Sequence, residues 1–178
     1  NRKSVSQLLE RCHTEKDFIL GEDAFVRDIT GSSNRALSRQ SRLGHLRDGA
    51  KERQWTDDND IKRLFCLDDD FPQRLAQCDD GPVILYKLGK CDLDAAHMVA
   101  IVGTRHADTY GVEFTRRLVE DLGNKVDDLV IVSGLAYGID VAAHRAALAG
   151  DIRTVAVTAN PLNTVYPAEH RGTASQII

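Results

Sequence analysis

The sequence of 178 residues lacks both common signatures of nucleotide-phosphate binding. It contains neither the G-x-G-x-x-G fingerprint of dinucleotide-binding proteins nor the P-loop pattern G-x-x-x-x-G-K-S/T. Because these glycine patterns are the usual way of holding NAD or ATP, neither molecule is indicated. We therefore expect the protein to require no cofactor.

The cysteines and histidines are too scattered to predict a metal site or a disulfide framework. The 4 cysteines stand far apart with no C-x-x-C pair, and the H-E-x-x-H motif is absent. Asp140 and His144 lie four residues apart on an expected helix, but two ligands do not make a metal site, and we expect structural roles for both. No catalytic set of paired carboxylates or Ser/His/Asp residues accompanies them, so no catalytic residue is predicted.

Long hydrophobic runs are also missing. No apolar run approaches the roughly 18 residues needed to cross a membrane. The first residues, NRKSVSQLLERC, contain neither the apolar core of a signal peptide nor an initial Met, as in a chain shortened at its N-terminus. The sequence predicts no membrane segment and a reducing, cytoplasmic location.

Charge is present in two opposed blocks within a net charge of -4. Residues 57–70 carry six aspartates, and the stretch before them is basic. The basic residues are Arg27, Arg35, Arg39, Arg42, Arg47, Lys51 and Arg53. They form either the solvated face of helices or an electrostatic footprint for a phosphate backbone. The composition changes near Trp55, which predicts a small helical domain over residues 1–57 and a second domain over residues 58–178.

Strands and helices are expected to alternate in the second domain. Apolar runs at 99–102, 129–132 and 154–157 predict strands, with helices between them at 110–122 and 139–149. Such runs are too apolar to face water on either side, which is typical of parallel strands covered by helices. The sequence predicts an α/β fold with a Rossmann-like parallel sheet, preceded by the small helical domain.

The first of these helices is expected to bury one apolar face. Phe114, Leu118 and Leu122 recur every four residues with Val119 beside them, and Glu113 and Glu120 lie outside this stripe. We expect the three apolar side chains to pack inward and the charged ones to face water.

A glycine turn follows each of the first two strands. Gly103, Thr104 and Arg105 come after the first strand, and residues 133–138, SGLAYG, come after the second. The carboxyl ends of neighbouring parallel strands meet at one edge of a sheet, where ligands bind. Backbone amides at two helix N-termini, the Arg105 guanidinium and the hydroxyls of Thr104 and Ser133 predict an anion site at this edge.

Several longer motifs occur in the order found in a known family. They are LDDDFPQRL, GPVILYKLG, IVGTR, SGLAYGIDVAAH, and TVAV followed by NTVYPAEHR, between about Leu64 and Arg171. In these motifs the chain resembles the DNA-processing protein A family, also called DprA or Smf. The resemblance implies an extended Rossmann-like domain, here with a sheet that is incomplete because it is truncated at the C-terminus at Ile178.

The same resemblance implies a function. Members of the family bind single-stranded DNA, protect incoming strands and hand them to the RecA recombinase during natural transformation. The implied partners are therefore single-stranded DNA and a RecA-type recombinase, with a possible homodimer formed through the Rossmann-like domain. The implied role is binding and delivery, and not enzymatic turnover.

Carried over position by position, the resemblance implies a DNA-binding site at the two turns. Its residues are Gly103, Thr104, Arg105, Ser133, Gly134, Ala136, Tyr137, Gly138 and Arg171. Tyr137 stands where many relatives look more basic, so we expect it to offer a stacking face or a hydroxyl. Residues 158–163 lack the glycines that many members have after the third strand, and this segment is expected to be less able to admit a ligand.

Two other classes of function stay open at this point. A nucleotide-cleaving enzyme of the lysine-decarboxylase-like type would use a similar sheet edge, but its P-G-G-x-G-T string is absent. A nucleotide-sensing or protein-interaction module would use the basic helical stretch to dock an acidic partner.

Overall fold

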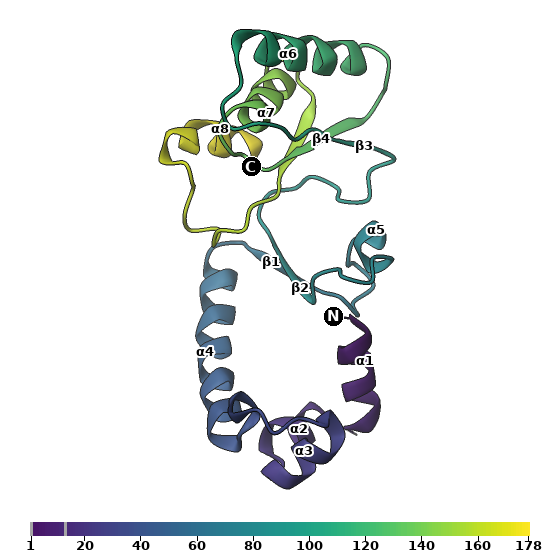
Figure 1. Ribbon diagram of the computed structural model, residues 1–178, viewed down its shortest axis with the longest axis vertical. Coiled ribbons are helices and arrows are strands. Elements are labelled where there is room, and N and C mark those ends of the chain that lie inside the picture. Colours follow the sequence, from purple (N-terminus) through teal and green to yellow (C-terminus); the bar gives the residue numbers. More distant parts are fainter. Residues whose placement is uncertain (1, 13) are drawn as a thin grey trace. The chain divides into compact units, whose positions relative to one another are not determined.

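The chain forms two compact units in the computed structural model, which describes residues 2–12 and 14–178. The units are Asn1–Lys87 and Leu88–Ile178, and each is considered by itself (Figure 1). The first unit contains α1 (Arg2–Arg11), α2 (Glu15–Leu20), α3 (Asp23–Thr30), the short helix η1 (Arg35–Leu37), α4 (Arg39–Asp58), β1 (Lys62–Phe65), α5 (Gln73–Ala76) and β2 (Ile84–Lys87).

A buried arginine holds the helices of the first unit together. Arg42 on α4 is only 5% exposed, although it belongs to the basic stretch noted in the sequence. Its guanidinium donates hydrogen bonds to the carbonyl oxygens of Gly21 and Leu37, and it forms an ion pair with Asp23 at 3.1 Å. The planar guanidinium thus supplies donors to carbonyl oxygens at the ends of α2 and η1 that would otherwise lack them. Arg42 therefore serves the fold and is not part of an exposed basic surface.

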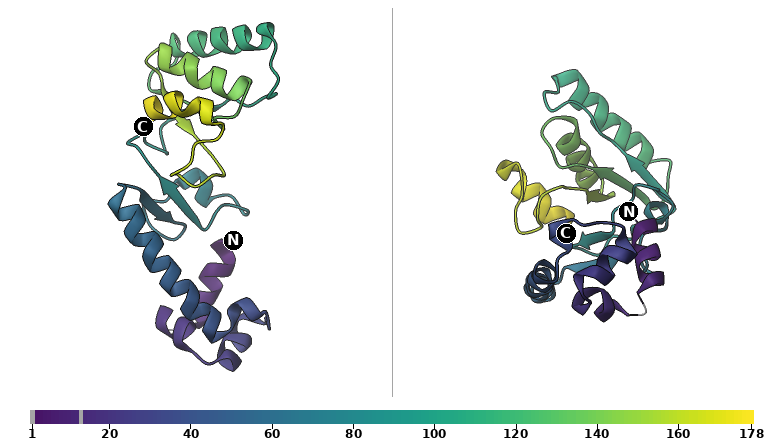
Figure 2. Two further views of the ribbon diagram at one scale, coloured as in Figure 1. Left: turned by 90° about the vertical axis from the view of Figure 1, so that its left-hand side faces the viewer. Right: turned by 60° about the horizontal axis from the view of Figure 1, so that its bottom comes forward.

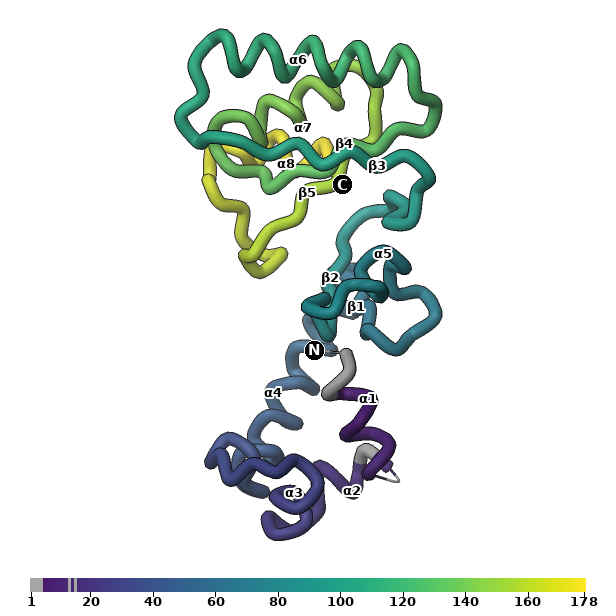
Figure 3. The backbone as a smooth tube through the Cα atoms, turned by 45° about the vertical axis from the view of Figure 1, so that its right-hand side comes forward, coloured from purple at the N-terminus to yellow at the C-terminus, as the bar shows by residue number. Residues whose placement is uncertain are grey.

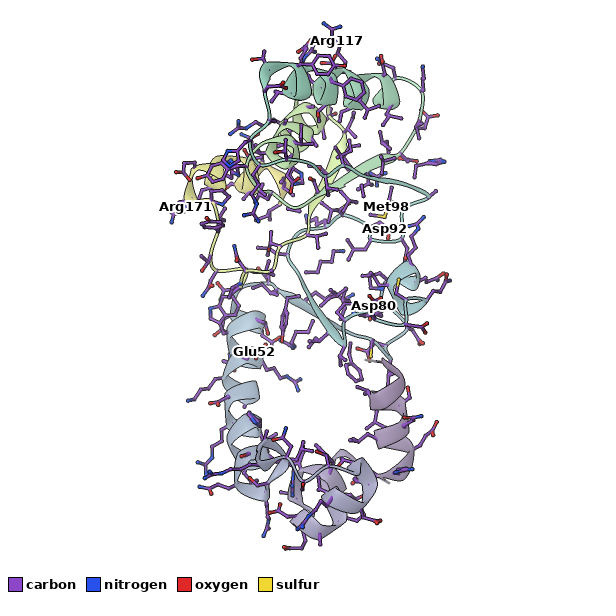
Figure 4. The ribbon with its side chains drawn as sticks, in the orientation of Figure 1. Glu52, Asp80, Asp92, Met98, Arg117 and Arg171 are labelled. Carbon is purple, nitrogen blue, oxygen red and sulfur yellow. The ribbon has the colours of Figure 1, made fainter. Side chains whose placement is uncertain are left out.

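Polar side chains join α4 to the antiparallel pair β1 and β2. Arg63 on β1 forms an ion pair with Asp57 at 2.8 Å. Tyr86, the register partner of Arg63 on β2, donates its hydroxyl to Glu52, which is labelled on α4 in Figure 4. The compact unit therefore continues to Lys87, beyond the boundary expected from composition, which falls within α4.

The second unit alternates strands and helices as the sequence predicts (Figure 3). Its elements are β3 (His97–Ala100), α6 (Thr109–Gly123), β4 (Leu129–Ser133), α7 (Ile139–Ala149), β5 (Arg153–Ala156), the short helix η2 (Ala168–His170) and α8 (Arg171–Ile177). The strands form a parallel sheet in the order β3-β4-β5. The expected α/β fold, with a parallel sheet after a helical region, is confirmed.

Helices α6, α7 and α8 lie side by side in this unit, and α7 contacts both β4 and β5 (Figure 2). Alanines make this close approach possible, because Ala143 and Ala147 on α7 are completely buried. They pack in one cluster with Ile131 of the central strand and Val119 of α6. The core thus lies between β4 and its covering helices. Among the described residues, no helix is long and apolar enough to cross a membrane.

The orientation predicted for α6 is wrong for Phe114 and Leu118, whereas Leu122 packs against the core as expected. Phe114 is 56% exposed and Leu118 37% exposed, whereas Thr115 and Val119 are buried. The small Gly111 on this helix faces Ile139, since a Cβ at Gly111 would lie 3.4 Å from the Ile139 Cδ1. Close contact with α7 therefore selects the face with small and β-branched residues and turns Phe114 and Leu118 outward.

Candidate functional site

The glycine turns after β3 and β4 interlock at the carboxyl edge of the sheet. Gly138 has φ 75° and ψ -124°, and a Cβ there would lie 2.1 Å from the carbonyl oxygen of Thr104. The Ile139 N–H donates to the same oxygen at 3.2 Å. Only glycine combines this left-handed backbone with this approach. The two turns are therefore held against each other as one structure.

Two more glycines allow this edge to pack closely. A Cβ at Gly103 would lie 2.7 Å from the Ile139 Cγ1, and one at Gly134 would lie 2.6 Å from the Asp140 Oδ2. Asp140 is 8% exposed and lies in the first turn of α7, where a carboxylate is favoured by the helix dipole. Asp140 thus supports the turn from within, in agreement with the structural role expected for it.

A pocket of about 160 Å³ opens beside the interlocked turns. It is lined by Arg105, Gly134, Ala136, Tyr137, Val157, Thr158, Ala159, Asn160, Tyr166 and Pro167. Tyr137 is 41% exposed and Tyr166 65% exposed. Within the described ranges no carboxylate lies at ion-pair distance from Arg105, which is also exposed. The pocket therefore combines a free cation with two aromatic rings.

Tyr137 is fixed in place by its neighbours. Its hydroxyl donates to the Glu169 Oε2 at 3.0 Å, and its ring meets the His170 ring edge-on with centroids 5.2 Å apart. The hydrogen bond to Glu169 raises the pKa of Tyr137, so the hydroxyl stays protonated. His170 is itself held by the Leu135 carbonyl oxygen at 2.8 Å from its Nδ1. With the hydroxyl engaged, the ring face is what Tyr137 can offer a ligand.

Ser133 and Arg171 lie outside the pocket lining. Ser133 is 3% exposed, and its hydroxyl donates to the Ile101 carbonyl oxygen at 2.6 Å, which joins β4 to the end of β3. Arg171 is exposed at the start of α8 (Figure 4). Thr104, by contrast, stays exposed in the first turn and accepts the His106 N–H at 3.2 Å through its hydroxyl oxygen. The structure thus brings together the two turns, with Ser133 beneath them and Arg171 outside the pocket lining.

The third wall of the pocket was missed by reasoning from the sequence. Val157, Thr158 and Asn160 line it from the end of β5, together with Tyr166. This segment was expected to be less able to admit a ligand than its glycine-rich counterpart in the family. Its position after a third parallel strand is the signal that could have identified it, because all such ends share one edge of the sheet.

His144 has a structural setting. It is completely buried, its Nδ1 lies 2.7 Å from the Thr154 Oγ1, and burial lowers its pKa to about 4. The described parts of the chain contain no group of three or more His, Cys, Asp or Glu residues able to hold a metal ion. His144 and Asp140 therefore act as parts of the core and of a turn.

A parallel sheet with interlocked glycine turns, an exposed arginine and aromatic side chains at its carboxyl edge defines a Rossmann-like α/β unit with a candidate anion site at its strand ends. Residues 62–178 match the family described as DNA recombination-mediator protein A. The chain belongs to this family, as its sequence motifs predicted.

Curated relatives agree with this assignment. The chain is 33% identical to DNA processing protein DprA of Streptococcus pneumoniae over 159 residues, which are 89% of this chain and 53% of that protein. It is 44% identical to a putative DprA of Mycobacterium tuberculosis over 99 residues, 54% of this chain and 25% of that protein. The chain thus spans about half the length of the pneumococcal relative, and a smaller share of the mycobacterial one.

Two solved structures are similar. The X-ray structure of DprA from Streptococcus pneumoniae has a TM-score of 0.73 and 28% identity, covering 99% of this chain and 59% of that one. A structure of DNA processing protein A from Helicobacter pylori has a TM-score of 0.56 and 30% identity, covering 66% of this chain and 51% of that one. The latter is described in terms of that protein's unique single-stranded DNA binding mode.

Proposed function

We propose that this chain binds single-stranded DNA as part of a cytoplasmic recombination mediator, which protects incoming strands and delivers them to a RecA-type recombinase in natural transformation. The observation that carries the proposal is the interlock of Gly138 with Thr104, which places the exposed Arg105 beside the tyrosine-walled pocket. The binding mode described for the related Helicobacter pylori protein supports the same ligand.

Each part of the edge suits a different part of a DNA strand. Glycine turns expose backbone N–H groups to phosphate oxygens, and the Arg105 guanidinium can hold a phosphate bidentately. The ring faces of Tyr137 and Tyr166 are suited to unpaired bases, which expose their π-faces in a single strand but not in a duplex. Because backbone amides and ring faces do not read base edges, binding is expected to tolerate any sequence.

The remaining residues of the predicted site have supporting roles in this proposal. Gly103, Gly134 and Ala136 shape the turns, and Ser133 fixes the strand ends beneath them. Arg171, which is exposed at the start of α8, is proposed to contact the phosphate backbone outside the pocket. Self-association through the Rossmann-like domain and delivery to the recombinase belong to the same proposal, as does a role without chemical turnover.

A titration tests the proposed ligand. Affinities for single-stranded homopolymers, mixed single strands, duplex DNA and a nucleoside monophosphate are measured at several salt concentrations. We expect every single strand to bind more tightly than duplex DNA. Affinity should fall as salt rises, because binding releases counterions. Equal affinity for duplex DNA, or no dependence on salt, would contradict the proposal. Preferred binding of the monophosphate would instead favour a nucleotide-binding protein of the lysine-decarboxylase-like type.

A further inference from the structure

A second pocket lies in the helical part of the first unit. It has a volume of about 320 Å³ and extends from α3 through η1 to the N-cap of α4 (Figure 1). Its lining residues are Asp23, Val26, Arg27, Ser32, Ser33, Asn34, Arg35, Leu37 and Ser38. Two of them, Arg27 and Arg35, belong to the basic stretch, for which the sequence allows either a solvated surface or a phosphate-binding role.

The arginines of the basic stretch differ in their surroundings. Arg42 is buried, and Arg39 forms an ion pair with Glu22 at 3.6 Å. Arg27 and Arg35 are exposed, and no described carboxylate lies at ion-pair distance from either of them. The pocket therefore gathers two guanidinium groups whose charge is not used within the described part of the unit.

The side-chain acceptors around the pocket are occupied. The Asp23 Oδ1 accepts the Arg39 N–H at 2.6 Å, and the buried arginine of α4 compensates its charge. The Asn34 Oδ1 accepts the Ala36 N–H at 2.9 Å, and the Ser32 Oγ accepts the Asn34 N–H at 3.2 Å. The loop between α3 and η1 thus uses these oxygens to hold its own backbone.

The side-chain donors of the pocket remain available. Among the described residues, no hydrogen-bond partner is present for the guanidinium groups of Arg27 and Arg35, the hydroxyl of Ser33 or the amide NH₂ of Asn34. A pocket with several unused donors favours a ligand that is rich in acceptors. A phosphate group fits this requirement, because it carries several charged oxygens and a guanidinium can hold two of them at once.

The charge around the pocket also favours an anion. Residues 21–42 contain four arginines and three acidic residues. Two of the acids are neutralised in the ion pairs of Glu22 and Asp23, and the third, Asp28, does not line the pocket. The local field is therefore positive where the two unpaired arginines lie.

We propose that this pocket binds a phosphate group, which is contacted by the Arg27 and Arg35 guanidinium groups and by the donors of Ser33 and Asn34. A phosphodiester in a DNA strand and a phosphomonoester of a free nucleotide present the same oxygens, and the experiment below distinguishes these two sources. The inference goes beyond the proposed binding at the glycine turns, because the pocket lies in the other unit and does not depend on those turns.

The test follows individual N–H groups by NMR during titration with inorganic phosphate. The full chain is isotope-labelled, ionic strength is held constant, and the backbone signals of Ser33 and Asn34 are recorded. Arg27→Gln and Arg35→Gln each remove one donor group of the pocket. Arg47→Gln is the matched control, since it removes the same charge from an exposed arginine outside the pocket. Acetate is titrated in parallel as an anion that is not a phosphate.

We expect saturable shifts at Ser33 and Asn34 with phosphate. Affinity should fall about fivefold or more in Arg27→Gln and in Arg35→Gln, because each loses a charge-assisted hydrogen bond, and should be unchanged in Arg47→Gln. All three variants should melt like the parent, since the replaced side chains are exposed. Thymidine monophosphate and an unphosphorylated thymidine homopolymer are then compared as competitors. The compound that displaces phosphate from the pocket identifies the source of the group.

Several outcomes would overturn the inference. They are the absence of saturable shifts at Ser33 and Asn34, an equal affinity for acetate, and equal weakening by Arg47→Gln. The proposed function is tested separately, through the signals of Gly134 at the sheet edge. A strand that shifts Gly134 while phosphate leaves Ser33 unchanged would overturn only the phosphate pocket. Saturable phosphate binding at Ser33 in a protein that binds no single strand would overturn only the proposed function.

Discussion

At the scale of single residues, Gly138 controls the geometry of the edge. Gly138→Ala should weaken single-strand binding and lower the unfolding free energy by about 1–3 kcal/mol, because a side chain at positive φ is strained and its Cβ would collide with the Thr104 carbonyl. Thermal melting and DNA titration measure the two effects. Gly172→Ala is the matched control, since it lies on α8 with nothing within 4 Å of an added Cβ. Parent-like binding by Gly138→Ala would show that the interlock is dispensable.

Arg105 should contribute one phosphate contact. Arg105→Ala is expected to weaken binding about equally for all sequences and to lower the slope of log affinity against log salt by roughly 0.7, the value per phosphate of a single strand. The unfolding free energy of this variant should stay within about 0.5 kcal/mol of the parent's, because the side chain is exposed. Arg145→Ala, an exposed arginine on α7 outside the pocket, is the control. Unchanged affinity and slope would exclude Arg105 as a phosphate ligand.

Replacing Arg42, unlike replacing Arg105, should lower the stability of the fold. Arg42→Met is expected to destabilise the first unit by about 2 kcal/mol or more, because the carbonyl oxygens of Gly21 and Leu37 lose their buried donor. Chemical denaturation measures the loss, with the exposed Arg47→Met as the control. Equal stability of the two variants would contradict a structural role for Arg42.

At the scale of elements, the buried imidazole on α7 makes the fold sensitive to acid. The pKa of His144 lies near 4 in the folded chain and near 6.5 in an unfolded one, so the unfolded chain binds more protons between these values. Stability should be full above about pH 6.5 and should fall by about 3 kcal/mol as the pH drops to about 4. Denaturant titrations across this range measure the change of unfolding free energy with pH. This slope should flatten in His144→Gln and persist in His106→Gln, which replaces an exposed histidine. An equal slope in both variants would assign the effect to other groups.

The sequence predicts some elements better than others for physical reasons. Strands β4 and β5 are recognisable because a run buried on both faces must be apolar throughout. The exposure of Phe114 and Leu118 on α6 was mispredicted, because periodicity locates an apolar stripe but does not say how much of it the core covers. Phe114 and Leu118 follow the helical period and yet face solvent, while Thr115 packs inward. The contact that decides this, between Gly111 and Ile139, joins two helices and has no local signature.

The same limit applies to the candidate site. The two glycine turns could be predicted because glycine after an apolar strand is a local pattern. The wall of the pocket formed by Asn160 and Tyr166 could not be predicted, since it depends on how the segment after β5 returns to the carboxyl edge of the sheet. Ser133 was expected to face a ligand, but its hydroxyl bonds to the end of the neighbouring strand, which only the sheet register reveals.

At the scale of the whole molecule, binding without turnover is the expected behaviour. Labelled single strands, duplex DNA and nucleoside monophosphates should remain intact after incubation with the protein, with or without divalent metal, because the anion site includes no recognisable catalytic set. Electrophoresis and chromatography of the nucleotides provide the measurement. A product that forms with the parent and disappears with Asp140→Ala would reveal an enzyme.

The interlocked turns also have a consequence for the kinetics of association. Because Gly138 and Thr104 already hold the two loops together, a strand bound as proposed would meet a preformed site, and little conformational freedom would be lost on capture. The encounter should then be governed by charge and diffusion, while the lifetime of the complex depends on how many phosphates and bases are engaged. Lengthening the strand should therefore slow release far more than it speeds capture.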